Sequence, residues 1–149
     1  MSDYKTYEVI VHGNGHKEWF LNGRLHREDG PAVERWDGGK LWYLNGNLHR
    51  EDGPASEWAC GRKEWYLNDK LHREGGPAVE CANGSKEWYL HGKYHREDGP
   101  AVERVNRTKK WYLHGEELTE EQHRQRTSSQ TCNGKIVEID GIKYKLTEV

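Results

Sequence analysis

Four His-Arg pairs are the residues of this chain whose types and spacing could support chemistry. They recur every 23 residues, as His26 and Arg27, His49 and Arg50, His72 and Arg73, and His95 and Arg96. A glutamate follows each pair, and in three of the four copies an aspartate comes next. Imidazole, guanidinium and carboxylate groups together suit metal binding, acid–base catalysis or anion recognition.

The spacing of these pairs disfavours a metal centre and an active site. Neighbouring strands lie ~4.8 Å apart, so equivalent histidines in two-stranded repeats are ~10 Å apart and cannot share one ion. Four near-identical sets also differ from an active site, whose members need unlike environments. The chain lacks Cys-x-x-Cys and His-Glu-x-x-His spacings and a nucleophile or phosphate-loop motif. We therefore expect no metal, no cofactor and no enzymatic activity. The simpler role for Arg50 and Glu51 is pairing with a neighbouring repeat or hydrogen bonding at a kink.

Anion recognition stays an alternative hypothesis. The four arginines are joined by a second basic column, which consists of Lys17, Lys40, Lys63, Lys86 and Lys109. A basic stripe beside aromatic rings could bind the phosphates of nucleic acid, a nucleotide or anionic lipid, with an affinity that falls steeply with salt. The adjacent carboxylates neutralise this stripe locally, which disfavours nucleic acid.

The whole chain is built around the same 23-residue period. One tryptophan marks each copy, at Trp19, Trp42, Trp65, Trp88 and Trp111. We assign residues 1–115 to a repeat array with units of about 8–30, 31–53, 54–76, 77–99 and 100–115. The tryptophan column is expected to be structural, with ligand stacking as the alternative.

Turn signals within each unit predict β-hairpins. Asn45-Gly46 is typical of a type I′ turn, which needs positive φ at both residues. A short strand is expected over 40–44, with Trp42 and Leu44 on one face and Tyr43 on the other. A long strand is expected from Leu48 to about residue 58, broken at 51–54 where a proline interrupts the ladder. The predicted fold is all-β, an elongated, twisted antiparallel sheet of about ten strands.

The composition bounds the class of protein. Of 149 residues, 33% are hydrophobic and 32% are charged, and the net charge of −2 argues against a strongly basic nucleic-acid surface. Seven Trp and eight Tyr are too many for a disordered chain, so we expect an aromatic core that is thin and spread out. The sequence shows no 18-residue apolar run and no signal peptide, and its three cysteines are widely spaced. These features favour a cytoplasmic protein with reduced thiols and no transmembrane segment.

The segment Trp88–Ala101, WYLHGKYHREDGPA, resembles a divergent form of the MORN repeat, which also has a 23-residue period. The resemblance covers 8–115 and implies an array of β-hairpins. This form is similar to MORN-like arrays encoded by phages and giant viruses, and more distantly to MORN-like antitoxins. Typical MORN units have His-Gly directly after the basic residue, whereas this chain has His-Arg-Glu-Asp-Gly. The resemblance therefore implies a fold more strongly than a ligand.

The C-terminal part follows a different pattern. Thr119 and Gln122 form a predicted capping box for a short helix at about 119–126, followed by a linker, so that 116–131 caps the array. Residues 132–149 are predicted to form a hairpin around Asp140-Gly141. Its apolar stripe, formed by Ile142, Tyr144 and Leu146, is the expected site of self-association or partner binding, and a homodimer is one form this could take.

These observations favour a non-catalytic binding protein over an enzyme. The leading hypothesis is a protein, encoded by a phage or virus, that binds and blocks a host protein or complex in the host cytoplasm, as in evasion of host defence. The viral part rests on the resemblance alone. The alternatives are phosphate binding through the Arg/Lys columns and an antitoxin-like partner of a toxin.

Overall fold

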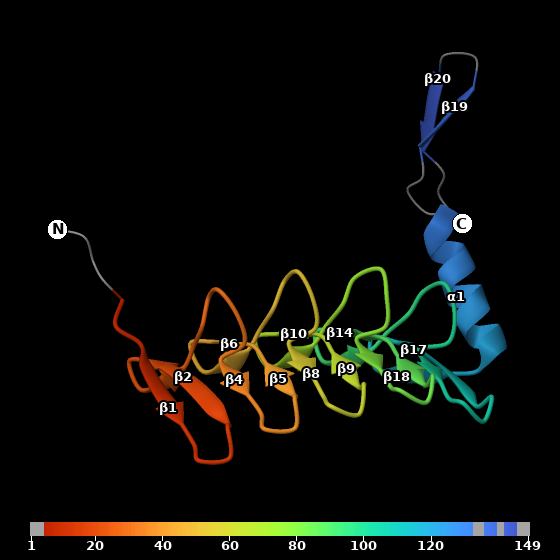
Figure 1. The fold of residues 1–149 in the computed structure, drawn as a ribbon. Coiled ribbons are helices and arrows are strands. Elements are labelled where there is room, and N and C mark those ends of the chain that lie inside the picture. Colours follow the sequence, from red (N-terminus) through yellow and green to blue (C-terminus); the bar gives the residue numbers. More distant parts are fainter. Residues whose placement is uncertain (1–4, 133–135, 140–141, 146–149) are drawn as a thin grey trace.

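The computed structural model describes residues 5–132, 136–139 and 142–145, and most of them belong to an elongated row of β-hairpins (Figure 1). Within the described residues, twelve strands form one antiparallel sheet. They are β1 (Glu8–Val11), β2 (Lys17–Leu21), β3 (Arg24–Leu25), β4 (Val33–Glu34), β5 (Lys40–Leu41), β8 (Ser56–Glu57), β9 (Lys63–Glu64), β12 (Val79–Glu80), β13 (Lys86–Glu87), β16 (Val102–Glu103), β17 (Lys109–Leu113) and β18 (Glu116–Leu118). The predicted all-β array of hairpin repeats is confirmed.

Three smaller hairpins lie beside this central sheet. They pair β6 (Tyr43–Leu44) with β7 (Asn47–Leu48), β10 (Tyr66–Leu67) with β11 (Lys70–Leu71), and β14 (Tyr89–Leu90) with β15 (Lys93–Tyr94). Each middle repeat thus contains four strands of two residues, where the sequence predicted two longer ones. The predicted break at 51–54 is confirmed, because no strand runs between β7 and β8 in the described chain.

The predicted continuous strand over 40–44 is wrong, because the ladder changes at Trp42. The Trp42 backbone N–H donates to the Ala55 carbonyl at 2.8 Å, and the Trp42 carbonyl accepts from the His49 N–H at 3.0 Å. The residue therefore connects the central sheet with the side hairpin of its own repeat. Strands β2 and β17, at the two ends of the array, stay continuous over five residues.

The side hairpins turn as predicted. Asn45 and Gly46 have φ values of 54° and 88°, the left-handed conformation that a type I′ turn requires. In the last two repeats His91 and His114 take the asparagine position, each with φ of 51°. Asparagine tolerates this conformation better than most residues. The backbone of the turn is therefore the same in these repeats, although histidine replaces asparagine.

The fully buried core is aliphatic and small rather than aromatic. One alanine from each of four repeats has no exposed surface, and a neighbouring column of valine is nearly as buried; these are Ala32, Ala55, Ala78 and Ala101, with Val33, Val79 and Val102. The five tryptophans of the repeat column are only half-buried. The expectation of an aromatic core is therefore corrected: small aliphatic side chains are fully buried, and the tryptophan rings are only half-buried and contact the loop arginines.

Helix α1 (Glu120–Cys132) covers the C-terminal end of the array (Figure 1). The capping box is confirmed: the Gln122 N–H donates to the Thr119 hydroxyl at 3.2 Å, and the Thr119 N–H donates to the Gln122 side-chain oxygen at 2.9 Å. The buried His123 ring lies 2.6 Å from the Arg96 carbonyl. Within the described residues, no helix is long and apolar enough to cross a membrane.

The predicted end of the array and the predicted linker are both corrected. Strand β18 pairs with β17, so the hairpin pattern continues through Leu118 instead of ending at Gly115. The helix includes the residues assigned to a linker. The hydroxyls of Thr127 and Ser128 donate to the carbonyls of His123 and Gln125 at 3.0 Å each, so both hydroxyls have partners within the helix.

The predicted C-terminal hairpin is present as β19 (Ile136–Ile139) paired with β20 (Ile142–Lys145). The side chains of Ile142 and Tyr144, and all of Leu146, lie outside the described part of the structure. Their predicted role in association stays a prediction.

Candidate binding surface

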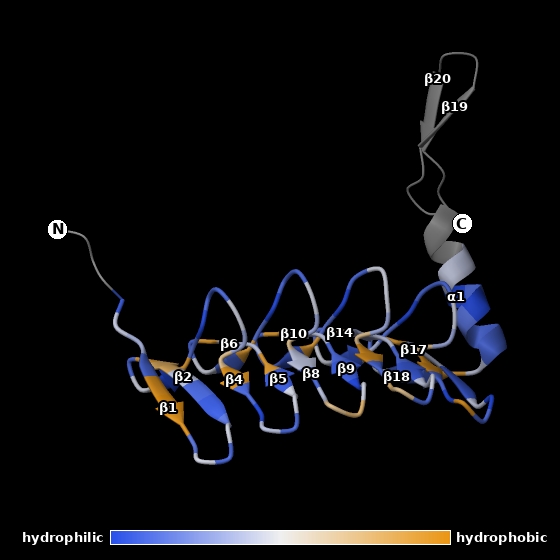
Figure 2. Ribbon diagram, viewed as in Figure 1, coloured by the Kyte–Doolittle hydropathy of each residue, from blue (hydrophilic) through white to orange (hydrophobic). Residues whose placement is uncertain are grey.

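The candidate functional surface is a row of grooves between the His-Arg-Glu loops of successive repeats. We call the five-residue segments 27–31, 50–54, 73–77 and 96–100 the kinked loops; they rise above the central sheet in Figure 1 and are largely hydrophilic in Figure 2. The grooves between them have volumes of about 710, 610 and 560 Å³. Trp42 and Leu44 both line the first groove, which confirms that they share a face.

Each arginine of the predicted columns holds its own kinked loop together. The Arg96 Nε donates to Asp98 at 2.8 Å, and its Nη1 donates to the Pro100 carbonyl at 3.2 Å and to Glu103 at 2.9 Å. The guanidinium carbon lies 4.0 Å from the centre of the Trp88 ring, a cation–π contact. Arg50 donates in the same way to the Pro54 carbonyl at 3.3 Å, so the prediction that Arg50 hydrogen-bonds the kink is confirmed.

The same arrangement recurs along the array. Arg27, Arg50 and Arg73 lie 4.3, 4.2 and 3.9 Å from the rings of Trp19, Trp42 and Trp65. Each of these arginines also donates to the carbonyl of the proline in its own loop. Both the arginine and the tryptophan columns therefore line the grooves while stabilising the loops.

The histidine column joins each repeat to the next. Nδ1 of His72 accepts the His91 backbone N–H at 3.1 Å, and Nδ1 of His95 accepts the His114 N–H at 3.1 Å. His26 and His49 accept the Asn45 and Asn68 N–H groups at 3.0 and 3.3 Å. An Nδ1 that accepts a backbone N–H carries no proton, so the neutral rings of His72 and His95 carry theirs on Nε2.

Burial reinforces the neutral state of two of these rings. The His72 and His95 side chains are buried, and burial lowers the pKa of both below the ordinary histidine value. The nearby His91 and His114 rings lower these pKa values further. His72 and His95 are thus hydrogen-bond acceptors between repeats at neutral pH.

Carboxylates are the most exposed charged groups at the rims of the grooves. The side chains of Glu51 and Asp52 are 85% and 84% exposed, and those of Glu97 and Asp98 are 64% and 82% exposed. The hydrogen bond from the loop arginine holds the pKa of Asp52 and Asp98 below the usual range. The rims are therefore negatively charged at neutral pH, while the arginines that would attract phosphate are engaged below them.

The lysine column is interleaved with glutamates across the central sheet. The row of cross-strand partners reads Lys17, Glu34, Lys40, Glu57, Lys63, Glu80, Lys86, Glu103 and Lys109. Opposite charges on facing positions attract one another and cancel at a distance. The sheet consequently presents alternating charge instead of a basic stripe.

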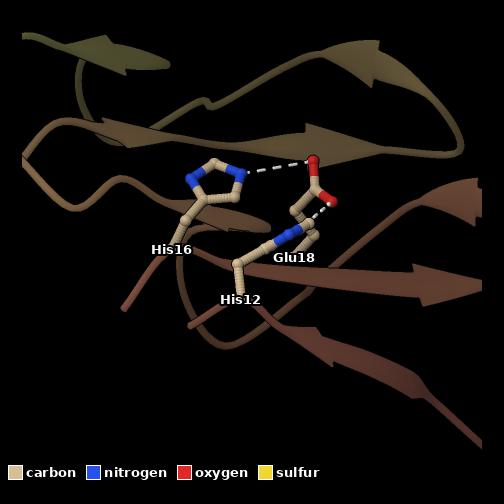
Figure 3. Close-up of side chains that lie close together, drawn as sticks. All are labelled: His12, His16 and Glu18. Atoms are coloured by element: carbon tan, nitrogen blue, oxygen red, sulfur yellow. Dashed lines mark hydrogen bonds and ion pairs between the residues drawn. The ribbon is translucent and has the colours of Figure 1, made fainter. Parts of the chain in front are cut away.

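One cluster of potential ligands escaped the sequence reasoning. His12, His16 and Glu18, at the turn between β1 and β2, bring one ligand atom each to within 4.8 Å of one another (Figure 3). Later repeats have no histidine at the positions that correspond to His12 and His16, so the search for repeating columns passed over these two residues.

The chain matches no protein-family model and no curated protein, so the function is argued from the geometry of this surface.

Proposed function

We propose that this protein is a non-catalytic binding protein that holds a partner protein in the row of grooves between its kinked loops. The observation that carries the proposal is the regular alternation of acidic rims with grooves lined by tryptophan and leucine. Repeat arrays use such extended surfaces to contact partners over several units at once.

The rims favour a partner with basic side chains. Glu51, Glu74 and Glu97 occupy the same position in three successive loops and all three are exposed. A protein segment with Lys or Arg at matching intervals would meet these carboxylates, and its apolar groups would meet the rings. Charge complementarity of this kind mainly determines specificity and the association rate.

Phosphate binding is less well supported. The guanidinium groups of the column contact tryptophan rings, proline carbonyls and carboxylates of their own loops. A phosphate would have to compete with these contacts and approach between exposed carboxylates. The same engagement supports a structural role for the His-Arg pairs rather than four copies of a catalytic set.

The proposal also includes the class of partner protein. The MORN-like resemblance favours a host protein or complex that a viral inhibitor blocks in the cytoplasm, with a toxin neutralised by an antitoxin-like protein as the alternative.

A pull-down with two matched variants tests the proposal. The rim variant carries Glu51→Gln, Glu74→Gln and Glu97→Gln, and the sheet variant carries Lys40→Gln, Lys63→Gln and Lys86→Gln. Each removes three exposed charges and leaves the arginine contacts in place. After nuclease treatment, we expect the wild type and the sheet variant to retain a stoichiometric protein and the rim variant to lose it. Capture that disappears with nuclease, or that depends on the lysines, would refute the proposal.

A further inference from the structure

The turn between β1 and β2 places two imidazoles around one carboxylate. His12 Nε2 lies 3.2 Å from one Glu18 carboxylate oxygen, and His16 Nε2 lies 3.4 Å from the other (Figure 3). The two imidazole ring centres are 5.0 Å apart. Three potential metal ligands thus converge on one small volume outside the grooves.

The backbone of the hairpin fixes this arrangement. The His12 N–H donates to the His16 carbonyl at 2.8 Å, so the two histidines face each other across the turn. Glu18, in β2, follows His16 by two residues and lies on the same face of the hairpin, with His16 Nε2 3.4 Å from its carboxylate. Gly15, with φ of +87°, closes the turn, and the Asn14 side chain accepts the His16 N–H at 3.0 Å. The ligands are held beside a short turn, with His12 directly after β1, His16 directly before β2 and Glu18 within β2.

The ligand types and distances fit a transition-metal ion. Two imidazole nitrogens and a carboxylate oxygen are common zinc ligands, with bonds of about 2.0–2.2 Å. Tetrahedral bonds of that length place ligand atoms about 3.3–3.5 Å from one another. The imidazole nitrogens lie 3.2 and 3.4 Å from two different Glu18 oxygens, and one ligand atom of each residue lies within 4.8 Å of the others, so a bound ion would draw the three groups closer together. We propose that His12, His16 and Glu18 bind a divalent transition-metal ion of the zinc class.

The site is open enough for an ion to enter. The side chains of His12, His16 and Glu18 are 46%, 21% and 27% exposed. Three protein ligands on a tetrahedral ion leave one position for water. A bound ion would link the end of β1 to β2, at the end of the array opposite helix α1.

The third repeat shows how the same carboxylate position is held without metal ligands. There Trp58 Nε1 donates to one Glu64 oxygen at 3.2 Å, and Arg62 Nε donates to the other at 2.8 Å. These residues occupy the positions of His12, His16 and Glu18 in the 23-residue register. Tryptophan and arginine can only donate, whereas a neutral imidazole offers a lone pair to a metal. Around this glutamate, the first repeat therefore has two possible metal ligands, whereas the third repeat has two hydrogen-bond donors.

This pairing provides a matched variant that keeps the hairpin. His12→Trp with His16→Arg transplants the third repeat's donors around Glu18. The control, His91→Asn with His114→Asn, removes two other exposed histidines and restores the asparagine found at these turn positions in earlier repeats. Circular dichroism checks that both variants fold.

Calorimetric titration of the reduced, tag-free chain with Zn²⁺ at pH 7.5 tests the proposal. The wild type and the control are expected to bind one equivalent with a dissociation constant below about 10 μM, and His12→Trp/His16→Arg is expected to lose at least about 100-fold in affinity. Co²⁺ gives an independent readout through the visible absorption of its bound form. Weaker binding by the wild type, or equal binding by the Trp/Arg variant, would overturn the assignment. The result is independent of the proposed partner binding, which the rim variant tests.

Discussion

The loop arginines should stabilise the array, and Arg96 gives a sharp test because its guanidinium contacts a ring, a backbone carbonyl and two carboxylates at once. Arg96→Met removes the donor to the Pro100 carbonyl, the contact with the Trp88 ring and the ion pairs with Asp98 and Glu103. A charged hydrogen bond contributes about 1.5–3 kcal/mol and a cation–π contact about 0.5–2 kcal/mol. The two ion pairs add less than about 1 kcal/mol each, since solvent screens them.

The methionine side chain recovers part of this stabilisation by packing on the ring. We therefore expect Arg96→Met to lower the free energy of unfolding by about 2–3 kcal/mol. Arg96→Lys keeps the charge but loses the planar fork, so it should recover less than half of the loss. Arg107→Met, in an exposed turn, makes the same chemical change and should stay within about 0.5 kcal/mol of wild type.

Urea unfolding followed by tryptophan fluorescence measures these differences. If Arg96→Met is as stable as the Arg107→Met control, the arginine does not hold its loop. The guanidinium would then be available to a ligand, and phosphate binding through the arginine column would regain support.

Three further predictions follow from the repeat contacts. Gly75 stands where other loops have an aspartate that pairs with the loop arginine, but its φ of +74° strains any L side chain. Gly75→Asp should therefore lower the free energy of unfolding by about 1 kcal/mol or more, measured by urea midpoint, and an increase would show that this loop can adopt the backbone conformation of the aspartate-bearing loops. Because the pKa values of His72 and His95 are lowered in the folded chain, the unfolded chain binds protons first, and stability should fall as the pH drops from about 6.5 toward 5, as seen in melting temperatures; a flat profile over that range would contradict the acceptor role. His123→Ala should lower the free energy of unfolding by about 1–2 kcal/mol and reduce the helical circular dichroism signal, because the ring is buried and lies against the Arg96 carbonyl. An unchanged spectrum would argue against docking of the helix through this residue.

Local rules predicted the turns and the helix start from the sequence. Asn45-Gly46 forms its turn because few residue pairs accept positive φ twice in succession. The capping box at Thr119 and Gln122 depends on residues three apart, and it formed as expected. The periodic tryptophans and prolines likewise set the repeat boundaries without knowledge of any tertiary contact.

Non-local contacts account for the features that were missed. The change of ladder at Trp42 depends on hydrogen bonds to Ala55 and His49, which sequence alternation does not reveal. The helix continues to Cys132, where composition alone favours a linker, and its contacts with β17 and β18 are not visible in the sequence pattern.

The histidine cluster could have been found from the sequence by a different search. His12 and His16 flank Asn14-Gly15, and residues that flank a hairpin turn face each other across it. Adding the period-two rule places Glu18 on the same face. The repeat columns drew attention to what recurs, and this cluster belongs to one repeat only.

Site-specific photocrosslinking tests the central claim of a protein partner held at the loop rims most directly. A benzophenone amino acid replaces Glu74 at an exposed rim in one sample and Lys63 in the lysine–glutamate row in another. In nuclease-treated extract of the source or host cell, the account predicts a discrete protein adduct from position 74 and none from position 63. An adduct from position 63 alone, or crosslinks to nucleic acid from either position in untreated extract with no protein adduct, would contradict it.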